Sequence, residues 1–261
     1  MTILDKLADH SRERVAAAKE RLSADEIKSL AQSLPKGSFE FEAAIKNNHD
    51  IAFICECKKA SPSKGIIAEN FPYLQIAKDY EAAGADCISV LTEPKWFLGS
   101  DEYLREIAES VAIPCIRKDF TVDEYMIYEA KLLGAKAVLL ICSILTTQQV
   151  KDYIDVCDSL GLSALVEAHD EAEVKSAVEC GARLIGVNNR NLKDFSVDTG
   201  NSRRMRELVP PGILFVSESG VKSAGDIELL REAGADAVLI GETLMRAENK
   251  TIKLAQLRGI A

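Results

Sequence analysis

A motif that recurs four times along the chain limits the folds open to it. Each copy has a helix end, a glycine suited to a left-handed C-cap, a short polar joint and an apolar run rich in β-forming residues. The copies are YEAAGADCISVL from Tyr80, AKLLGAKAVLLI from Ala130, AVECGARLIGVN from Ala177 and LREAGADAVLIG from Leu230. Their glycines, at positions 84, 134, 181 and 234, are 50, 47 and 53 residues apart. Each interval is about twice the length of one strand and helix, so each should contain a further strand.

Apolar segments of the expected kind lie between the copies. They are IPCIRKDF (113–120), LSALVEAH (162–169) and GILFVSES (212–219), and DIAFICEC (50–57) precedes the first copy. Eight such strands alternating with helical patterns indicate a parallel sheet covered on both faces. We predict one (β/α)8 TIM-barrel domain over residues 1–261. An open doubly wound sheet is the competing fold, but no GxGxxG or GxxxxGK[ST] motif follows any strand.

Residues 1–50 lie outside this repeat. They are expected to form two or three helices, one of which begins at Ser23 with Glu26 in capping-box spacing. We therefore predict an N-terminal helical extension packed on the barrel.

The composition of the chain limits the kinds of molecule that it can be expected to bind. A net charge of -9 and a pI near 5.1 argue against nucleic-acid binding. A membrane span needs about 18 consecutive apolar residues, and no apolar run approaches that length. The first residues do not resemble a targeting signal. We therefore expect no membrane association and a cytoplasmic location. The chain has seven cysteines, none of them in a CxxC motif, and its three histidines are far apart in the sequence. We therefore expect no metal and no disulfide.

Charged residues end the odd-numbered strands of the predicted barrel. They are Glu56 and Lys58 on the first strand, Lys118 on the third, Glu167 on the fifth and Glu218 on the seventh. Active sites of such barrels lie at the C-terminal ends of the strands, and alternate strands supply one layer of side chains. One strand-end charge usually belongs to the solvated rim or to a structural ion pair, but five in one inward register indicate a site for acid–base chemistry.

The two-residue period of a strand separates inward from outward positions. If Glu56 and Lys58 face the barrel axis, Cys55 and Cys57 face the helices. The outward neighbours Lys59, Arg117 and Asp119 are then expected to be rim residues or members of structural ion pairs.

The even-numbered strands indicate an anion site. GVNNRN places Asn188 on the inward register with Arg190 just beyond, and LIGET places Gly241 at a strand end. The small residues of SESG and GET, after strands seven and eight, would let backbone amides approach an anion. Loops at these positions commonly bind phosphate in TIM barrels.

Six motifs, in order, resemble those of the indole-3-glycerol phosphate synthase family across essentially the whole chain. They are ECKKASPSKG, IRKDF, LVEAH, IGVNNRNL, SESG and IGETLMR. The resemblance implies conversion of 1-(2-carboxyphenylamino)-1-deoxyribulose 5-phosphate into indole-3-glycerol phosphate, carbon dioxide and water, in tryptophan biosynthesis. It implies a small phosphorylated substrate and no metal or organic cofactor. A monomer is expected, and association with other tryptophan-pathway enzymes stays open.

The resemblance also assigns catalytic roles. Lys118 corresponds to the acid that protonates the ketose carbonyl during ring closure. Glu167, Glu56 and Lys58 correspond to acid–base groups of the later steps, with Lys58 also near the anionic groups of the substrate. Which carboxylate is the base in dehydration stays open.

Further residues match positions that hold the substrate. Asn188, Glu218 and Ser219 match groups that orient it and support the catalytic lysine, and Arg190 matches a residue facing the anthranilate carboxylate.

The remaining matches concern phosphate. Ser61, Gly220 and Gly241 match the phosphate site. Glu242 stands where several relatives have a small serine, so we expect its amide to bind the phosphate while its carboxylate points to solvent.

Two other functions fit the same residues. A strand-end lysine such as Lys118 can form an imine, so a Schiff-base aldolase or a sugar-phosphate isomerase is an alternative. The third possibility is a barrel that binds a phosphorylated ligand without turnover.

Overall fold

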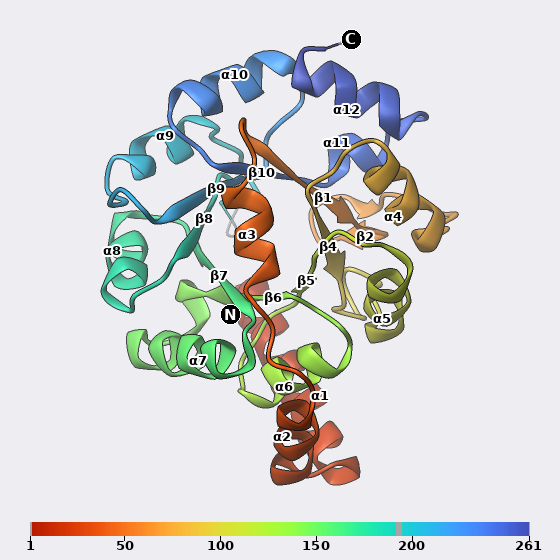
Figure 1. The fold of residues 1–261 in the computed structure, drawn as a ribbon, viewed down its shortest axis with the longest axis vertical. Helices are drawn as coiled ribbons and strands as arrows, with labels where there is room; N and C mark the ends of the chain where they lie inside the picture. The colour runs from red at the N-terminus through yellow and green to blue at the C-terminus, as the bar shows by residue number, and fades with distance from the viewer. Residues whose placement is uncertain (1, 192–194, 261) are drawn as a thin grey trace.

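Eight parallel strands form a closed barrel in the computed structural model, which describes residues 2–191 and 195–260 (Figure 1). The barrel strands are β1 (Ala52–Cys57), β4 (Cys87–Leu91), β5 (Cys115–Lys118), β6 (Ala137–Ile141), β7 (Ser163–Ala168), β8 (Leu184–Asn188), β9 (Leu214–Glu218) and β10 (Ala237–Ile240). Each strand pairs with the next along the chain, and β1 pairs with β10 to close the ring. The (β/α)8 barrel predicted from the repeat is confirmed.

Helices surround the barrel (Figure 1). They are α4 (Tyr73–Ala82), α5 (Asp101–Ser110), α6 (Tyr125–Leu132), α7 (Thr147–Leu160), α8 (Glu171–Glu179), α9 (Gly200–Arg206), α10 (Ala224–Glu232), the short α11 (Glu242–Met245), α12 (Lys250–Arg258) and the 3₁₀ turn η1 (Cys142–Ile144). The four repeat glycines have φ between 79° and 86° and end α4, α6, α8 and α10, as the motif predicted. None of the helices in the described ranges is long and apolar enough to cross a membrane.

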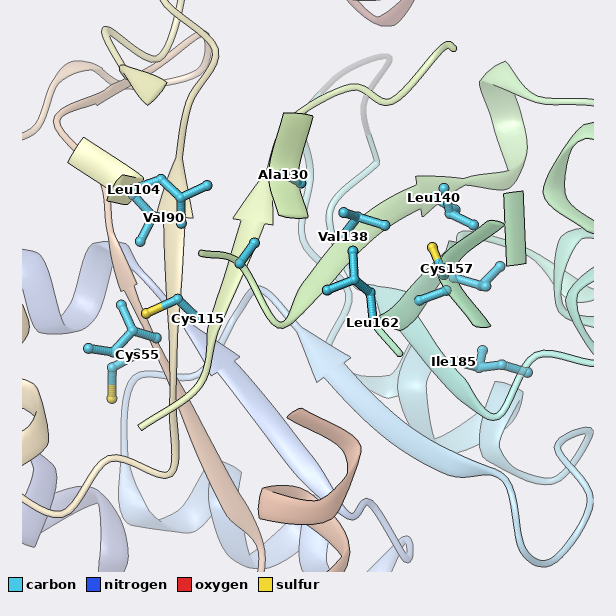
Figure 2. Close-up of a cluster of buried hydrophobic side chains, with 14 of the residues drawn as sticks. Cys55, Val90, Leu104, Cys115, Ala130, Val138, Leu140, Cys157, Leu162 and Ile185 are labelled. Carbon is cyan, nitrogen blue, oxygen red and sulfur yellow. The ribbon is translucent and has the colours of Figure 1, made fainter. Parts of the chain in front are cut away.

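Alternation along the strands divides the core into two layers. Ile54 of β1 lies in the buried cluster inside the barrel, whereas Cys55 and Cys57 belong to the cluster between strands and helices. Figure 2 shows part of this outer layer, with Cys55 of β1, Cys115 of β5 and Leu104 of α5. The predicted orientation of the two cysteines is confirmed.

The described residues before β1 form the helices α1 (Ile3–Arg21), α2 (Ala24–Ser33) and α3 (Glu40–Lys46). The capping box at Ser23 and Glu26 begins α2, as its spacing predicted. Phe41 and Ile45 of α3 belong to the buried cluster inside the barrel, together with the first residues of β1 and β8 (Ala52 and Leu184). Helix α3 therefore closes the N-terminal end of the barrel (Figure 1).

Helix α1 reaches the opposite end of the barrel, where the site lies. Polar contacts hold it to the loops that follow β4 and β5. They are a hydrogen bond between His10 Nδ1 and Glu93 Oε1 (3.1 Å) and the ion pairs of Arg14 Nη2 with Asp119 Oδ1 (2.6 Å) and of Lys19 Nζ with Asp123 Oδ2 (2.7 Å). The extension is therefore part of the wall at the C-terminal ends of the strands.

A two-stranded antiparallel sheet, β2 (Ala60–Ser61) and β3 (Gly65–Ile66), follows β1 and was not predicted. Strands of two residues are too short to show an alternating pattern. The turn between them is held by the Lys64 amide, which donates to the Ser61 carbonyl at 3.2 Å.

Candidate active site

A cavity of about 560 Å³ lies at the C-terminal ends of the barrel strands. It is lined by all of the site residues predicted from the sequence: Glu56, Lys58, Ser61, Lys118, Glu167, Asn188, Arg190, Glu218, Ser219, Gly220, Gly241 and Glu242. Strand ends that are distant in sequence thus converge on one site.

Lys118 stands between two buried carboxylates. Its Nζ lies 3.2 Å from Glu167 Oε2 and 3.4 Å from Glu218 Oε2. Burial by itself would lower the pKa of Lys118, but Glu167, Glu218 and Glu56 raise it well above its ordinary value. Lys118 is therefore an ammonium ion at neutral pH and carries a proton into the cavity.

The two carboxylates beside Lys118 differ in charge. Burial raises the pKa of Glu218 to about 8, the charge of Glu167 adds to that effect, and Lys118 opposes it. Burial also acts to raise the pKa of Glu167, but Lys118 and His169 outweigh it and lower that pKa. At neutral pH Glu167 is ionised and Glu218 is largely protonated. Such a divergence between two neighbouring carboxyl groups is typical of acid–base sites.

Glu56 and Lys58 form a second charged pair. Lys58 Nζ donates to Glu56 Oε2 at 2.5 Å, and Ser89 Oγ donates to Glu56 Oε1 at 3.4 Å. A Cβ at Gly241 would collide with the Glu56 carboxylate and with Lys58 Nζ. Gly241 therefore lies directly against this pair, and its lack of a side chain is what makes room for it.

Asn188 links β8 to the loop after β9. Its Oδ1 accepts hydrogen bonds from Ser219 Oγ (2.9 Å) and from the Arg190 amide (3.0 Å), and its side chain also bonds Glu167. Ser219 has φ 68°, in the left-handed region that is uncommon for residues other than glycine. Strained backbone of this kind is frequent where a site must hold one geometry.

Arg190 lines the cavity. Its Nη1 donates to the Phe195 carbonyl at 3.2 Å, and its backbone forms an isolated bridge with Val197. Leu192, the last residue of the predicted motif IGVNNRNL, lies outside the described residues.

The loops after β9 and β10 contain Gly220 and Gly241, which were predicted to bind phosphate. Gly220 has φ 97°, and a Cβ there would lie 2.6 Å from Thr199 Cγ2. Cationic side chains line the same side of the cavity, namely Lys64, Lys222 and Arg246. None of the three was singled out from the sequence, although Lys64 belongs to ECKKASPSKG and Arg246 ends IGETLMR; Lys222 lies two residues beyond SESG.

The Glu242 carboxylate was expected to point to solvent. Its side chain is 29% exposed and forms ion pairs with Arg246 Nε at 3.1 Å and Lys64 Nζ at 3.7 Å. Burial acts to raise its pKa, but these cations lower it, so the group is charged.

The outward neighbours predicted to lie outside the chemistry mostly form ion pairs. Arg117 Nη2 lies 2.7 Å from both Asp101 and Glu129, and Asp119 pairs with Arg14. These groups fix α1 and α5 to the barrel. The half-buried Lys59 follows β1.

An apolar wall completes the cavity and was missed by the sequence analysis. It includes Leu4 and Leu7 of α1, Phe97 after β4 and Phe120 after β5. Phe120 could have been found, because it continues the inward register two residues beyond Lys118. The α1 leucines could not, because nothing in their spacing indicates which surface they cover.

Solved structures with the same fold differ strongly in sequence. A thiamine phosphate pyrophosphorylase from Pyrococcus furiosus matches with a TM-score of 0.60 at 15% identity, over 80% of this chain and 94% of that one. A 3-hexulose-6-phosphate synthase matches with a TM-score of 0.66 at 14% identity, over 80% of this chain and 99% of that one. These likenesses show the TIM-barrel fold.

Sequence relatives show the family. The family model described as indole-3-glycerol phosphate synthase matches residues 4–257. The indole-3-glycerol phosphate synthase of Ruminiclostridium cellulolyticum is 60% identical over 99% of this chain and 100% of its own length. Those of Lachnoclostridium phytofermentans and Leuconostoc mesenteroides are 47% and 48% identical, over 99% and 98% of this chain and 99% of each relative. A family match over nearly the whole chain, together with a cavity that gathers every predicted site residue, shows that this chain belongs to the indole-3-glycerol phosphate synthase family.

Proposed function

We propose that this chain acts as a carboxy-lyase that closes the indole ring of 1-(2-carboxyphenylamino)-1-deoxyribulose 5-phosphate. The observation that carries the proposal is the Lys118 ammonium held between Glu167 and Glu218 in a cavity with one apolar and one cationic side. Such a cavity matches a substrate with an aromatic ring at one end and a phosphate at the other.

The two sides of the cavity orient the substrate. The phosphate lies at the backbone of Gly220 and beside Ser61, with cations of the loops nearby. The aromatic ring lies against Phe97 and Phe120, and its carboxylate faces Arg190. This placement brings the ketose carbonyl to Lys118.

Ring closure needs one proton donor. The ring carbon that carries the carboxylate attacks the ketose carbon, and the electrons of the carbonyl bond move to oxygen, which takes a proton from Lys118. The bond to the carboxylate then breaks, carbon dioxide leaves, and its bonding electrons restore the aromatic ring. Protonated Glu218, 3.4 Å from Nζ, can return a proton to Lys118.

Dehydration needs an acid and a base. A base takes the amine proton, the nitrogen electrons expel the new hydroxyl, and an acid protonates the hydroxyl as it leaves as water. A proton then moves from the adjacent ring carbon to nitrogen and completes the indole. We assign these proton transfers to Glu56 and Glu167, whose carboxylates both line the cavity.

Product analysis tests the proposal. Incubation with the substrate should yield indole-3-glycerol phosphate, measured by indole fluorescence, and one equivalent of carbon dioxide. Borohydride added during turnover should trap no covalent adduct. An adduct on Lys118 would instead support the Schiff-base aldolase, and ligand binding without product would support the non-catalytic barrel.

A further inference from the structure

His169 links the catalytic carboxylate Glu167 to a second carboxylate behind it. Its Nε2 lies 3.4 Å from Glu167 Oε1, and its Nδ1 lies 3.1 Å from Glu173 Oε2. The other oxygen of Glu167, Oε2, accepts the hydrogen bond from Lys118. A continuous row of charged groups therefore runs from Glu173 on α8 through His169 and Glu167 to Lys118.

The start of α8 fixes the imidazole ring. Glu173 Oε2 accepts from the His169 amide at 2.8 Å as well as lying beside Nδ1, and the Asp170 side chain caps the helix by accepting from the Glu173 amide at 3.0 Å. Because a carboxylate oxygen only accepts hydrogen bonds, the contact with Glu173 requires a hydrogen on Nδ1. The ring then has only one orientation, with Nε2 directed at Glu167.

The surroundings of Nε2 favour a second proton on the ring. Nε2 is buried and has no hydrogen-bond partner within the described ranges, so Glu167 Oε1 is the charged atom that it faces. A lone pair there would face a carboxylate, whereas an N–H would meet it favourably. Burial opposes the charged ring, but the hydrogen bond to Glu173 and the charges of Glu167 and Glu173 raise the pKa of His169.

The charged groups that face the ring are Glu167 on β7 and Glu173 at the start of α8. The Asp170 side chain caps the same helix, and Glu218 on β9 is largely protonated. Cys142 of η1 is neutral, because burial raises the pKa of its thiol to about 12. From α9, the neutral Asn201 side chain donates to the His169 carbonyl at 3.1 Å. The cation on this row, Lys118, lies on the far side of Glu167.

We propose that His169 is a positioning residue for the reaction: as an imidazolium it holds Glu167 Oε1, so that Glu167 stays ionised and presents Oε2 to Lys118. The inference deepens the proposed function and rests on it. Each oxygen of the Glu167 carboxylate then faces its own cation, which fixes the rotation of the carboxylate. Because α8 supplies Glu173, the first turn of this helix takes part in setting the chemistry of the site.

The pH profile of turnover tests this role. The part of the pH–rate curve that reports the ionisation of Glu167 (its limb) is identified by its absence from the residual activity of Glu167→Gln. Removing a neighbouring cation raises the pKa of a carboxyl group, so His169→Gln should move this limb to higher pH by about one unit, a tenfold change in proton affinity. The value of kcat should fall by about tenfold with KM little changed. His49→Gln, at an exposed histidine outside the site, is the matched control and should match the wild type.

Titration of the ring by ¹⁵N NMR tests the proposal without turnover. The chain has three histidines, so their signals can be assigned from single variants. His169 should titrate above the ordinary histidine value of about 6.5, and Glu173→Gln should lower its pKa. An ordinary or lowered pKa, or an unmoved Glu167 limb in His169→Gln, would overturn the proposal. If product never forms while His169 still titrates high, the proposed function fails and the charged row stands.

Discussion

Lys58 Nζ donates to the Glu56 carboxylate at 2.5 Å, at the point where β1 ends. Both side chains line the cavity, so both project to the same side of the chain. Cys57, between them, is buried in the layer under the helices. Neighbouring positions of one strand therefore serve different purposes, which site-directed variants can separate.

Glu56→Gln should lower kcat by at least about tenfold while the melting temperature stays unchanged or rises. The substitution keeps the shape of the side chain and removes the charge that the site requires. Cys57→Ser is the matched variant: it places a hydroxyl in an apolar layer, so it should lower the melting temperature and spare kcat. Unfolding of Glu56→Gln with kcat retained would make Glu56 a structural ion-pair partner.

Glu218 should make stability fall as pH rises. Its pKa is about 8 in the fold and near 4.5 in the unfolded chain, so the folded state binds the proton more tightly. The stability due to this proton is fully present below about pH 4.5 and is lost as pH rises through about 8. Glu218→Gln should therefore raise the melting temperature relative to wild type more at pH 9 than at pH 5.

Glu167→Gln is the control with the opposite sign. Because the pKa of Glu167 is lowered in the fold, its charge stabilises the protein above its unfolded pKa, and this variant should lower the melting temperature at neutral pH. Melting curves of both variants from pH 5 to 9 measure the difference. Equal, pH-independent shifts would contradict the assigned charges.

Gly220→Ala should raise KM more than it lowers kcat. The added Cβ would press on Thr199 Cγ2 and displace the loop that is proposed to bind the phosphate. Gly212→Ala is the matched control, because Gly212 has φ 92° but open space around its Cβ position. Steady-state kinetics, with inorganic phosphate as a competitor, measure the effect. An equal KM for both variants would place the phosphate elsewhere.

Leu7→Ala should weaken both stability and substrate binding. Leu7 is buried in the interior cluster and lines the cavity, so its loss should cost about 2–5 kcal/mol of unfolding free energy and raise KM. Ile27→Ala on α2 removes a similarly buried side chain that does not line the cavity, and it should lower stability with KM unchanged. A Leu7→Ala enzyme with wild-type KM would show that α1 only supports the fold.

Local sequence patterns predicted the barrel and most of the site. The spacing of the repeat glycines requires a second strand in each interval, and the period of two separates Glu56 from Cys57. Both are properties of neighbouring residues, which a sequence displays directly.

Contacts between distant segments could not be predicted in this way. His10 meets Glu93 and Arg14 meets Asp119 across about a third of the chain, and these pairs place α1 over the site. Likewise, His169 was recognised only as part of a motif, because its link to Glu173 depends on how α8 begins. The β2–β3 hairpin depends on a turn, and its two-residue strands are too short to show a periodic pattern in the sequence.

The central claim is that Lys118 delivers the proton that closes the ring. Lys118→Met keeps the packing of the aliphatic stem and removes the ammonium, whereas Lys136→Met removes an ammonium that pairs with Glu40 outside the cavity. The decisive measurement is kcat for indole-3-glycerol phosphate formation by both variants, with folding checked by circular dichroism. The account predicts a fall of about 10²–10⁴-fold for Lys118→Met and wild-type turnover for Lys136→Met. A folded Lys118→Met enzyme that turns over at close to the wild-type rate would contradict it.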